Sequence, residues 1–576
     1  MKYLFLLFSY CLSLSAIAQQ ATDLISPEKG GIKFQKQSLK AKNQIVVTAH
    51  PLASTAAYNI LHNGGNAIDA MVTAQTVLGL VEPQSSGLGG GAFLVYYDAK
   101  SQTITTFDGR ETAPFEAPND LFMAKDKTPL AFFDAVVGGR SVGTPGTVKL
   151  LWETHKKYGQ KLWEDLLKPA SKLASNGFKV SPRLANSIKN DSKHLQTDIT
   201  TASYFFPDGQ PLKEGENLKN PNYADTLKQL SVNGGDYYYG KEFSQSIVEK
   251  VKQAKNSGHL STKDFKQYTI IERLATCSTY HQYNICGMGP PSSGAITVSQ
   301  TLGILENLKL SQMSPDKAQT WHIISEASRL AFADRGLYIA DPSYVNIPSG
   351  LLSKTYFRNR AKLINTQSSS KVISPGKPDA LTTSKFSQGR SPEQNSTSHF
   401  VIVDRIGNIV SMTSTIENGF GSRLMVKGFL LNNELTDFSF SSEKNGKLVA
   451  NRVEAGKRPR SSMAPTIVFK NNKPYLALGS PGGSRIINYV TNSLIAILDW
   501  QYPIQNAFNM PHIVNRFGTM DVEENTSATN LISDFKSMGY EVSMRNLNSG
   551  LHGVLFTDSG MIGAADNRRE GLVVGD

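Results

Sequence analysis

Cysteine is scarce in this sequence, with three residues among 576. Cys11 lies in an apolar stretch at the N-terminus, which leaves Cys277 and Cys286 in the body of the chain. No histidines at metal-ligand spacing accompany this pair, so a zinc site is not indicated and we expect no metal. The residues between the two cysteines have the pattern of two short strands around a turn. In an oxidising compartment, we therefore expect a disulfide across this hairpin.

A concentrated basic patch is also lacking, although the formal net charge is +12. Lysine and arginine are scattered along the chain, and the one tight cluster covers residues 457–460. A nucleic-acid-binding protein needs its basic side chains on one patch or stripe, so we expect no nucleic-acid partner. A diffuse positive surface that attracts small anionic substrates explains the charge equally well.

Long hydrophobic runs are absent beyond the N-terminus. Lys2 precedes an apolar run that ends at a small-x-small cleavage site, Ala16-Ile17-Ala18. This pattern predicts a signal peptide over residues 1–18, with a retained anchor as the alternative. The run is too short to span a membrane comfortably. We therefore expect a periplasmic or secreted protein without a stable membrane anchor.

Apolar periodicity predicts a mixed fold without internal repeats. Helical spacing runs through residues 51–80, with a break at 64–66, and through an amphipathic segment at 321–334. The glycine run 87–91 precedes a strand, whereas nucleotide-binding and phosphate-binding loops follow one, so we interpret it as close backbone packing and expect no cofactor. The first half is helix-rich and the second strand-rich. This favours an α+β domain with sheets inside and helices outside.

A change of composition marks the segment before Thr397. Residues 366–396 lose periodicity and are rich in small and polar residues, which predicts a flexible linker. Strand patterns resume at Thr397. A threonine with a free α-amino group carries its own general base and can act as a nucleophile without a histidine. Cleavage between Ser396 and Thr397 would create such a residue.

Thr397 opens a predicted hairpin made of residues 397–404 and 409–416. If residue 404 pairs with residue 409, Thr397 lies opposite residue 416, give or take one position. Thr415 and Glu417 then flank its hydroxyl. The same pattern also suits an ordinary hairpin, because threonine favours strands.

Three distant features favour a site around Thr397. Glu434 and Asp437 follow an apolar run and, with Glu417, could bind a substrate ammonium. The paired hydroxyls of Ser461 and Ser462 are suited to donate hydrogen bonds to a carboxylate. The adjacent glycines at 482–483 precede a predicted helix over 486–498, and their N–H groups would make an oxyanion hole.

These motifs together resemble those of the γ-glutamyltranspeptidases, members of the N-terminal-nucleophile hydrolase superfamily. The resemblance covers nearly the whole mature chain and rests on seven segments: 107–114 (FDGRETAP), 290–294 (PPSSG), 332–335 (FADR), the hairpin at Thr397, 431–438 (LNNELTDF), 457–466 (KRPRSSMAPT) and 479–485 (GSPGGSR). One departure is Val401, where the family usually has a small hydroxyl residue. The resemblance implies a four-layer αββα sandwich formed jointly by a large subunit (19–396) and a small catalytic subunit (397–576), which remain associated as a heterodimer.

The resemblance also implies a role for each site residue. Thr397 would cleave the bond after Ser396 and then serve as the catalytic nucleophile, with Thr415 hydrogen-bonded to its hydroxyl. The remaining roles fall into three groups: the γ-glutamyl α-carboxylate would be held by Arg110, Ser461 and Ser462, its α-ammonium by Glu417, Glu434 and Asp437, and the oxyanion by Gly482 and Gly483. Arginine can bind a carboxylate through two parallel hydrogen bonds.

The implied reaction is acyl transfer from glutathione or a related γ-glutamyl compound. Thr397 would form a γ-glutamyl ester, which passes to water or to an amino acid or dipeptide acceptor. Two alternatives remain: a cephalosporin (glutaryl) acylase of the same fold, or a non-catalytic exported binding protein. Residues 439–456, where the family carries a lid, contain no tyrosine or tryptophan, which favours hydrolysis over transfer.

Overall fold

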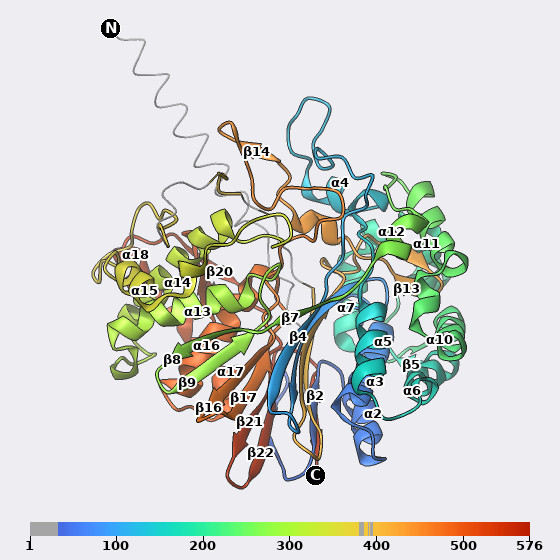
Figure 1. The fold of residues 1–576 in the computed structure, drawn as a ribbon, viewed down its shortest axis with the longest axis horizontal. Coiled ribbons are helices and arrows are strands. Elements are labelled where there is room, and N and C mark those ends of the chain that lie inside the picture. Colours follow the sequence, from blue (N-terminus) through green and yellow to red (C-terminus); the bar gives the residue numbers. More distant parts are fainter. Residues whose placement is uncertain (1–32, 379–384, 390, 392–395) are drawn as a thin grey trace.

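The structure is a computed structural model that describes residues 33–378, 385–389, 391 and 396–576. The predicted signal peptide, residues 1–18, lies outside the described residues, as does part of the predicted linker. Two seven-stranded sheets lie face to face at the centre, and helices cover the outer face of each (Figure 1). This is the predicted α+β, four-layer αββα sandwich.

Both central sheets are antiparallel and draw strands from before and after Thr397. The first sheet has the order β1 (Leu39–Ala41), β22 (Gly560–Ala565), β21 (His552–Thr557), β17 (Lys473–Gly479), β16 (Thr466–Lys470), β9 (Tyr283–Gly287) and β8 (Thr276–Tyr280). The second has the order β23 (Leu572–Gly575), β2 (Ile45–Thr48), β10 (Ser398–Val403), β11 (Ile409–Thr415), β3 (Gly91–Asp98), β4 (Thr103–Gly109) and β7 (Ile271–Leu274). The two predicted subunits are therefore interleaved in each sheet.

Alternation along β10 explains how this strand is buried on both faces. Val401 and Val403 belong to the apolar cluster between the sheets, whereas Phe400 and Ile402 belong to the cluster beneath the outer helices. Successive side chains of a strand point to opposite faces, so a strand in the middle layers is buried at every position. The polar residues Ser398 and His399 of β10 bond to the buried side chains of Glu82 and Thr413. Val401 suits its place between the sheets.

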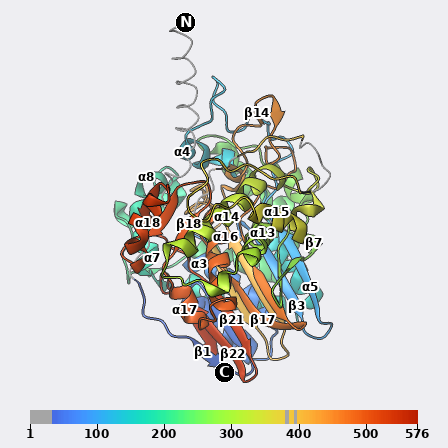
Figure 2. The same cartoon turned by 90° about the vertical axis from the view of Figure 1, so that its left-hand side faces the viewer.

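Helices form a layer over the outer face of each central sheet. The first sheet is covered by α13 (Gly294–Leu305), α14 (Ala318–Tyr338), α15 (Lys354–Ala361), α16 (Ile486–Leu498), α17 (Ile504–Asn509) and α18 (Ile532–Ser537), several of which lie in front of its strands in Figure 2. The second is covered by α2 (Pro51–His62), α3 (Ala67–Val81), α5 (Thr147–Tyr158), α6 (Trp163–Asn176), α10 (Pro221–Asn233) and α11 (Lys241–Gln253).

The remaining elements are short. The helices are α4 (Phe132–Val136), α7 (Pro182–Asn190), α8 (Ser192–Leu195), α9 (Ile199–Phe205) and α12 (Thr262–Gln267). Small sheets pair β5 (Phe178–Lys179) with β6 (Asn217–Leu218), β12 (Met425–Val426) with β13 (Phe429–Leu430), and β14 (Glu443–Lys444) with β15 (Lys447–Leu448). A further sheet contains β18 (Ile513–Asn515), β19 (Met520–Glu523) and β20 (Val542–Arg545).

Two helix predictions fared differently. The break at residues 64–66 is confirmed, because α2 ends at His62 and Asn66 caps α3 through a capping box with Asp69. The amphipathic prediction for α14 is wrong, because this helix is buried on nearly every side. Its polar residues bond to distant segments instead of water: for example, Ser328 donates to the carbonyl of Asn515 at 2.8 Å.

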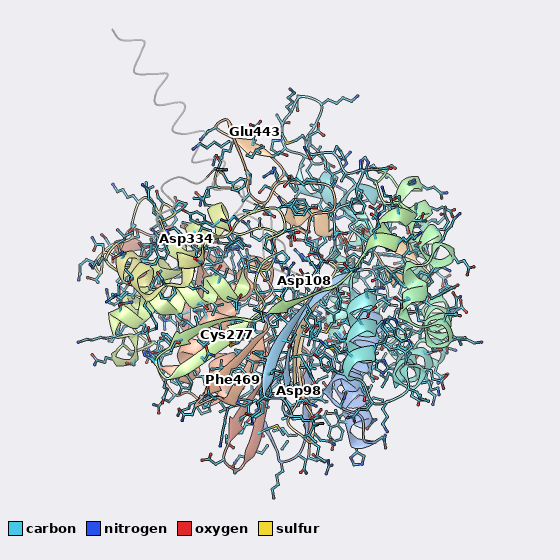
Figure 3. The ribbon with its side chains drawn as sticks, in the orientation of Figure 1. Asp98, Asp108, Cys277, Asp334, Glu443 and Phe469 are labelled. Atoms are coloured by element: carbon cyan, nitrogen blue, oxygen red, sulfur yellow. A yellow bond between two sulfur atoms is a disulfide. The ribbon has the colours of Figure 1, made fainter. Side chains whose placement is uncertain are left out.

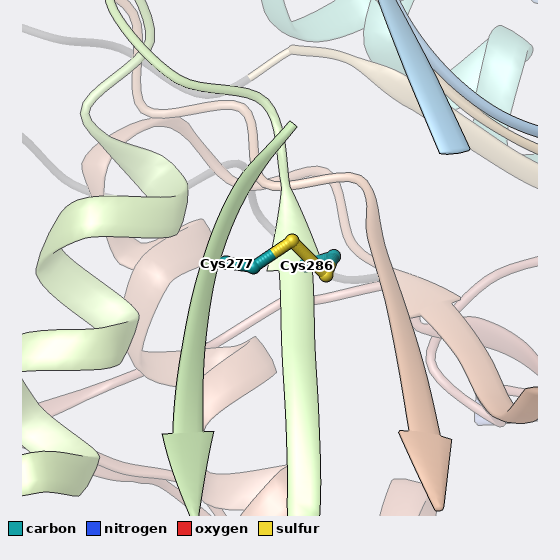
Figure 4. Close-up of a disulfide and its surroundings, with 2 residues drawn as sticks. All are labelled: Cys277 and Cys286. Atoms are coloured by element: carbon teal, nitrogen blue, oxygen red, sulfur yellow. A yellow bond between two sulfur atoms is a disulfide. The ribbon is translucent and has the colours of Figure 1, made fainter. Parts of the chain in front are cut away.

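The glycine run and the cysteine pair both have the predicted roles. A Cβ atom on Gly90 would lie 2.0 Å from the carbonyl oxygen of Thr415, so only glycine lets β3 and β11 approach at this point. Cys277 and Cys286 are opposite each other on β8 and β9, and their sulfurs are bonded at 2.06 Å (Figure 4). The predicted disulfide is confirmed.

The hairpin at Thr397 forms with a register one residue away from the central prediction. Val403 pairs with Ile409, and Ser398 pairs with Ser414, which places Thr397 beside Thr415 rather than residue 416. Asp404 leaves the strand because its Oδ1 accepts hydrogen bonds from the backbone of residues 406 and 408 and closes the turn. The shift lies within the predicted margin.

Candidate active site

The site forms where several strands end at one edge of the sandwich. In the second sheet, β10 begins just after Thr397, β11 ends at Thr415, and β4 ends one residue before Arg110. In the first sheet, β16 begins shortly after Ser462 and β17 ends shortly before Gly482. Antiparallel neighbours begin and end at the same edge, so residues far apart in sequence meet here.

Thr397 is in position to react with the peptide bond that precedes it. Its Oγ1 donates a hydrogen bond to the carbonyl oxygen of Ser396 and lies 3.4 Å from Oγ1 of Thr415. Thr415 Oγ1 donates to the same carbonyl at 2.8 Å and accepts from the backbone N–H of Glu417, also at 2.8 Å. Two hydroxyls therefore converge on one buried carbonyl group.

Backbone conformation at Glu417 is unusual. Its φ angle is +76°, a left-handed value that side-chain-bearing residues adopt at some energetic cost. The conformation directs its N–H to Thr415, while Asn433 donates from Nδ2 to Oε2 of Glu417. Glu417 is thus fixed beside the two threonines.

Arg110 is the buried cation of the site. Its guanidinium forms ion pairs with Glu434 and Asp437 and donates to the carbonyls of Pro459 and Arg460 at 3.1 and 3.0 Å. Burial alone would lower the pKa of Arg110, but the two carboxylates raise it overall. The groups predicted to bind opposite ends of a substrate therefore pair with each other in this structure.

Glu111 adds a second carboxyl group beside Glu434. Burial, followed by the charge of Glu434, raises the pKa of Glu111 well above its ordinary value. Burial also raises the pKa of Glu434, and Arg110 opposes that shift. Two adjacent buried carboxylates resist ionising together, so the pKa values of both groups are raised.

The segment that carries Ser461 and Ser462 is held close to Arg110 by charge. Arg458 pairs with Asp108, which Figure 3 shows at the centre of the molecule, at 2.5 Å between Nη1 and Oδ1. Asp108 lies on β4 two residues before Arg110. This pair draws the basic cluster at 457–460 into the interior, which explains why it is buried rather than a surface patch.

The two glycines lie at the start of a helix, as predicted. Gly483 opens a short 3₁₀ turn over 483–485, and α16 follows it directly. Gly482 has a φ of +135°, and a Cβ atom there would lie 2.7 Å from the ring of Tyr489. Glycine is therefore required at Gly482 by both its backbone angle and its neighbour.

A cavity of about 270 Å³, counted with its open mouth, joins these groups. Its lining includes nine of the ten predicted catalytic and substrate-binding residues, and Gly482 is adjacent in sequence to it. The full lining is Arg110, Thr397, Thr415, Glu417, Glu434, Asp437, Ser461, Ser462, Met463, Gly483 and Ile486. Within the described part of the chain, no cluster of three or more His, Cys, Asp or Glu residues is arranged to hold a metal ion.

Comparison with known proteins gives the family. The family model described as Gamma-glutamyltranspeptidase matches residues 53–575. The chain belongs to the γ-glutamyltranspeptidase family. A glutathione hydrolase proenzyme from Bacillus subtilis (strain 168) is 35% identical over 551 residues, which cover 94% of this chain and 92% of the relative.

The chain is also similar to acylases. The Acylase ACY 1 proenzyme from Pseudomonas sp. (strain SE83) is 30% identical over 558 residues, covering 95% of this chain and 96% of the relative. The crystal structure of a cephalosporin acylase from Bacillus halodurans has a TM-score of 0.82 at 24% identity, covering 96% of this chain and 99% of that one. This last likeness supports the fold alone.

Two arginines that contact Thr397 or Ser462 were not predicted as site residues from the sequence. Arg569 donates from Nη1 to the carbonyl of Thr397 at 3.2 Å, and Arg335 donates to Ser462. Arg335 belongs to one of the resembling motifs, which was the available signal. Arg569 gave none, because its contact with Thr397 joins residues that are distant in sequence.

The segment 439–456, where we expect a lid, contacts the predicted linker. Ser387, from the predicted linker, donates its N–H to the carbonyl of Leu448 at 2.8 Å, and Asn451 donates to Ser391 at 3.1 Å. Glu443 lies on the β14–β15 hairpin, which projects at the top of the molecule in Figure 3.

None of the described helices is long and apolar enough to cross a membrane.

Proposed function

We propose that this protein is an autoprocessed γ-glutamyl hydrolase and transferase that cleaves the γ-glutamyl amide of glutathione and related compounds. The observation that carries the proposal is one cavity in which Thr397 lies with a buried arginine, three acids, two serines and a glycine turn. A γ-glutamyl group presents a carboxylate, an ammonium and a scissile amide carbonyl, and the cavity offers a partner for each. The relatives named glutathione hydrolase proenzymes support the same substrate.

Activation begins with cleavage of the Ser396–Thr397 bond. Oγ1 of Thr397 attacks the carbonyl carbon of Ser396, the C–N bond breaks, and the acyl group moves from nitrogen to oxygen. Water then hydrolyses this ester, which leaves a carboxylate on Ser396 and a free amine on Thr397. The hydroxyl proton of Thr397 ends on the nitrogen that is released. The contact between Thr397 Oγ1 and the Ser396 carbonyl places the nucleophile beside its target, and the hydrogen bond from Thr415 supports the step because such a donor stabilises the developing oxyanion.

The cut leaves a large subunit (19–396) and a small one (397–576), which we infer remain a heterodimer. In each central sheet, strands from before Thr397 are hydrogen-bonded to strands from after it. Separation of the pieces would break backbone hydrogen bonds and expose apolar faces along several strands, at a large cost in free energy.

Catalysis then uses the amine that cleavage released. The Thr397 amine accepts the hydroxyl proton while Oγ1 attacks the γ-carbonyl of the substrate. The C–N bond of the substrate breaks, its amine leaves with a proton, and a γ-glutamyl ester remains on Thr397. Water or an amino acid or dipeptide acceptor resolves the ester, while the N–H groups at Gly482 and Gly483 stabilise the oxyanion.

The charges of the substrate replace the ion pairs that Arg110 forms with Glu434 and Asp437. The α-carboxylate binds Arg110, Ser461 and Ser462, and the α-ammonium binds Glu417, Glu434 and Asp437. A ligand with both charges satisfies both sets, whereas burying either set without a partner costs several kcal/mol, on the order of the penalty for a broken buried pair.

The acylase alternative is weighed by charge. A glutaryl amide has the carboxylate and lacks the ammonium, so it would leave the three acids without a cationic ligand. This disfavours a glutaryl acylase, although acylases are among the relatives. A non-catalytic binding protein is disfavoured because the cavity brings together both threonines and Gly483.

Thr397→Ala tests the proposal directly. Gel electrophoresis should show two fragments for the wild type and one full-length chain for the variant, which should also lack activity. A variant that still cleaves would refute the nucleophile assignment. Turnover of γ-glutamyl-p-nitroanilide with and without glycylglycine, beside glutaryl-p-nitroanilide, identifies the substrate class. We expect hydrolysis to dominate over transfer. We also expect the signal peptide at residues 1–18 to direct export, which makes the protein periplasmic or secreted.

A further inference from the structure

We propose that Arg335 is a positioning residue that orients Ser461 and Ser462 to bind the carboxylate of the substrate. This inference rests on the proposed function and adds a residue to it. Arg335 lies near the end of α14, far in sequence from both serines and from Thr397.

Arg335 reaches Ser462 directly. Its Nη2 donates to Oγ of Ser462 at 2.7 Å, and the arginine is 2% exposed. The guanidinium lies over the ring of Phe332, 5.4 Å from the ring centroid, which helps to fix its plane. Arg335 is not among the cavity-lining residues described above, so its effect on a ligand passes through its hydroxyl partner.

The hydrogens that each group carries show which one donates in this contact. A guanidinium carries only donors, so the Ser462 hydroxyl accepts from Arg335 and must direct its own hydrogen elsewhere. A hydroxyl that accepts from a cation is also polarised toward donating. Arg335 therefore prepares Ser462 as a donor to an anion, the role that the substrate carboxylate requires.

Arg335 reaches Ser461 through a second arm. Its Nε donates to Oγ of Ser293 at 2.7 Å, and that hydroxyl donates to the carbonyl of Ser461 at 2.6 Å. The backbones are also joined, since Ser293 N–H donates to the Ser461 carbonyl and Ser461 N–H donates to the carbonyl of Pro291. One planar side chain thus fixes both serines, which a lysine with its single point charge could not do equally well.

The test compares substrates that differ by one charge. γ-Glutamyl-p-nitroanilide has both charges, glutaryl-p-nitroanilide lacks the ammonium, and 4-aminobutyryl-p-nitroanilide lacks the carboxylate. We expect Arg335→Met to lower kcat/KM about 10- to 100-fold for the first two, mainly by raising KM, because a hydrogen bond to a charged group is lost. For 4-aminobutyryl-p-nitroanilide the change should be under about 3-fold.

Controls separate positioning from structural damage. Arg360→Met removes another buried arginine, paired with Asp334 next in sequence to Arg335, and should affect all three substrates alike. In a Ser462→Ala background, Arg335→Met should have a much smaller effect than in the wild type. If a gel shows that Arg335→Met impairs cleavage at Thr397, Ser293→Ala is tested in its place. The fall in kcat/KM for Ser293→Ala should again be confined to the substrates that carry a carboxylate.

Equal losses on all three substrates would overturn the role of Arg335. Failure of the wild type to prefer γ-glutamyl-p-nitroanilide would instead overturn the proposed function. The two failures are distinguishable, because the contrast between glutaryl and 4-aminobutyryl substrates tests Arg335 whichever amide the enzyme prefers.

Discussion

Removing the hydroxyl of Thr415 should slow self-cleavage while leaving the fold intact. Thr415 donates to the scissile carbonyl of Ser396 at 2.8 Å, in a place that is 3% exposed. Thr415→Val keeps the branched shape and removes this donor. Loss of one oxyanion donor typically costs about 100- to 1,000-fold in rate, so we expect a slowing of that order.

The variant also loses a structural hydrogen bond. The N–H of Glu417 donates to Thr415 Oγ1 at 2.8 Å, and its loss should lower the free energy of unfolding by about 1–3 kcal/mol. A destabilisation of this size leaves a protein of typical stability folded. Slow cleavage and moderate destabilisation should therefore be seen together.

The assay is a time course of the precursor on a denaturing gel after purification. Thr413→Val is the matched control, because Thr413 precedes Thr415 by two residues on β11 and bonds instead to His399 at 2.8 Å. We expect Thr413→Val to cleave at nearly the wild-type rate. Wild-type cleavage by Thr415→Val, or equal slowing in both variants, would refute the oxyanion role.

Two further predictions concern stability. Burial lowers the pKa of His399 to about 3, so between pH 6.5 and 3 the folded state binds fewer protons than the unfolded state. His399 should therefore lower the free energy of unfolding by about 1.4 kcal/mol for each pH unit of acidification in this range. In urea unfolding at several pH values, the free energy of unfolding of His399→Gln should fall less steeply with acidification by this amount, and an unchanged pH dependence would contradict the prediction. Cys277→Ser, which opens the loop closed by Cys286, should lower the free energy of unfolding by about 2–3 kcal/mol in the same assay, with no further loss on adding reductant.

The candidate site was predictable from the sequence to an unusual degree because its parts have local signatures. Thr397 follows a change of composition, the serines follow a basic cluster, and the glycines precede a helix. Each signature is weak alone, and the resemblance joined them. The cavity that lines up Thr397 with Arg110 and Ser462 agrees with that reading.

Features that depend on tertiary partners were not predictable. Helix α14 read as amphipathic, yet His322 bonds to Tyr540 and Ser328 to the carbonyl of Asn515, so its polar side faces protein. Nothing within the helix sequence indicates those partners. The hairpin register moved by one residue for a related reason, because the Asp404 side chain closes the turn. Periodicity cannot distinguish a strand end from such a turn.

The ion pairs of Arg110 bear on the specificity of the proposed enzyme. Arg110 is paired with Glu434 and Asp437, so none of these three buried groups is an isolated charge. On the proposed function, a γ-glutamyl ligand would break the pairs and offer an opposite charge to each side. A glutaryl ligand satisfies Arg110 and leaves the acids, and a 4-aminobutyryl ligand does the reverse.

Discrimination between these ligands should therefore depend on which buried charges each one leaves unpaired. An unpaired buried charge costs several kcal/mol, which is far more than a missing methylene group in an apolar pocket costs. On the proposed function, both incomplete ligands should bind poorly, because each must disrupt a satisfied ion pair of Arg110. If glutaryl and γ-glutamyl anilides had similar kcat/KM values, the pairing of Arg110 with the acids could not be the basis of selectivity.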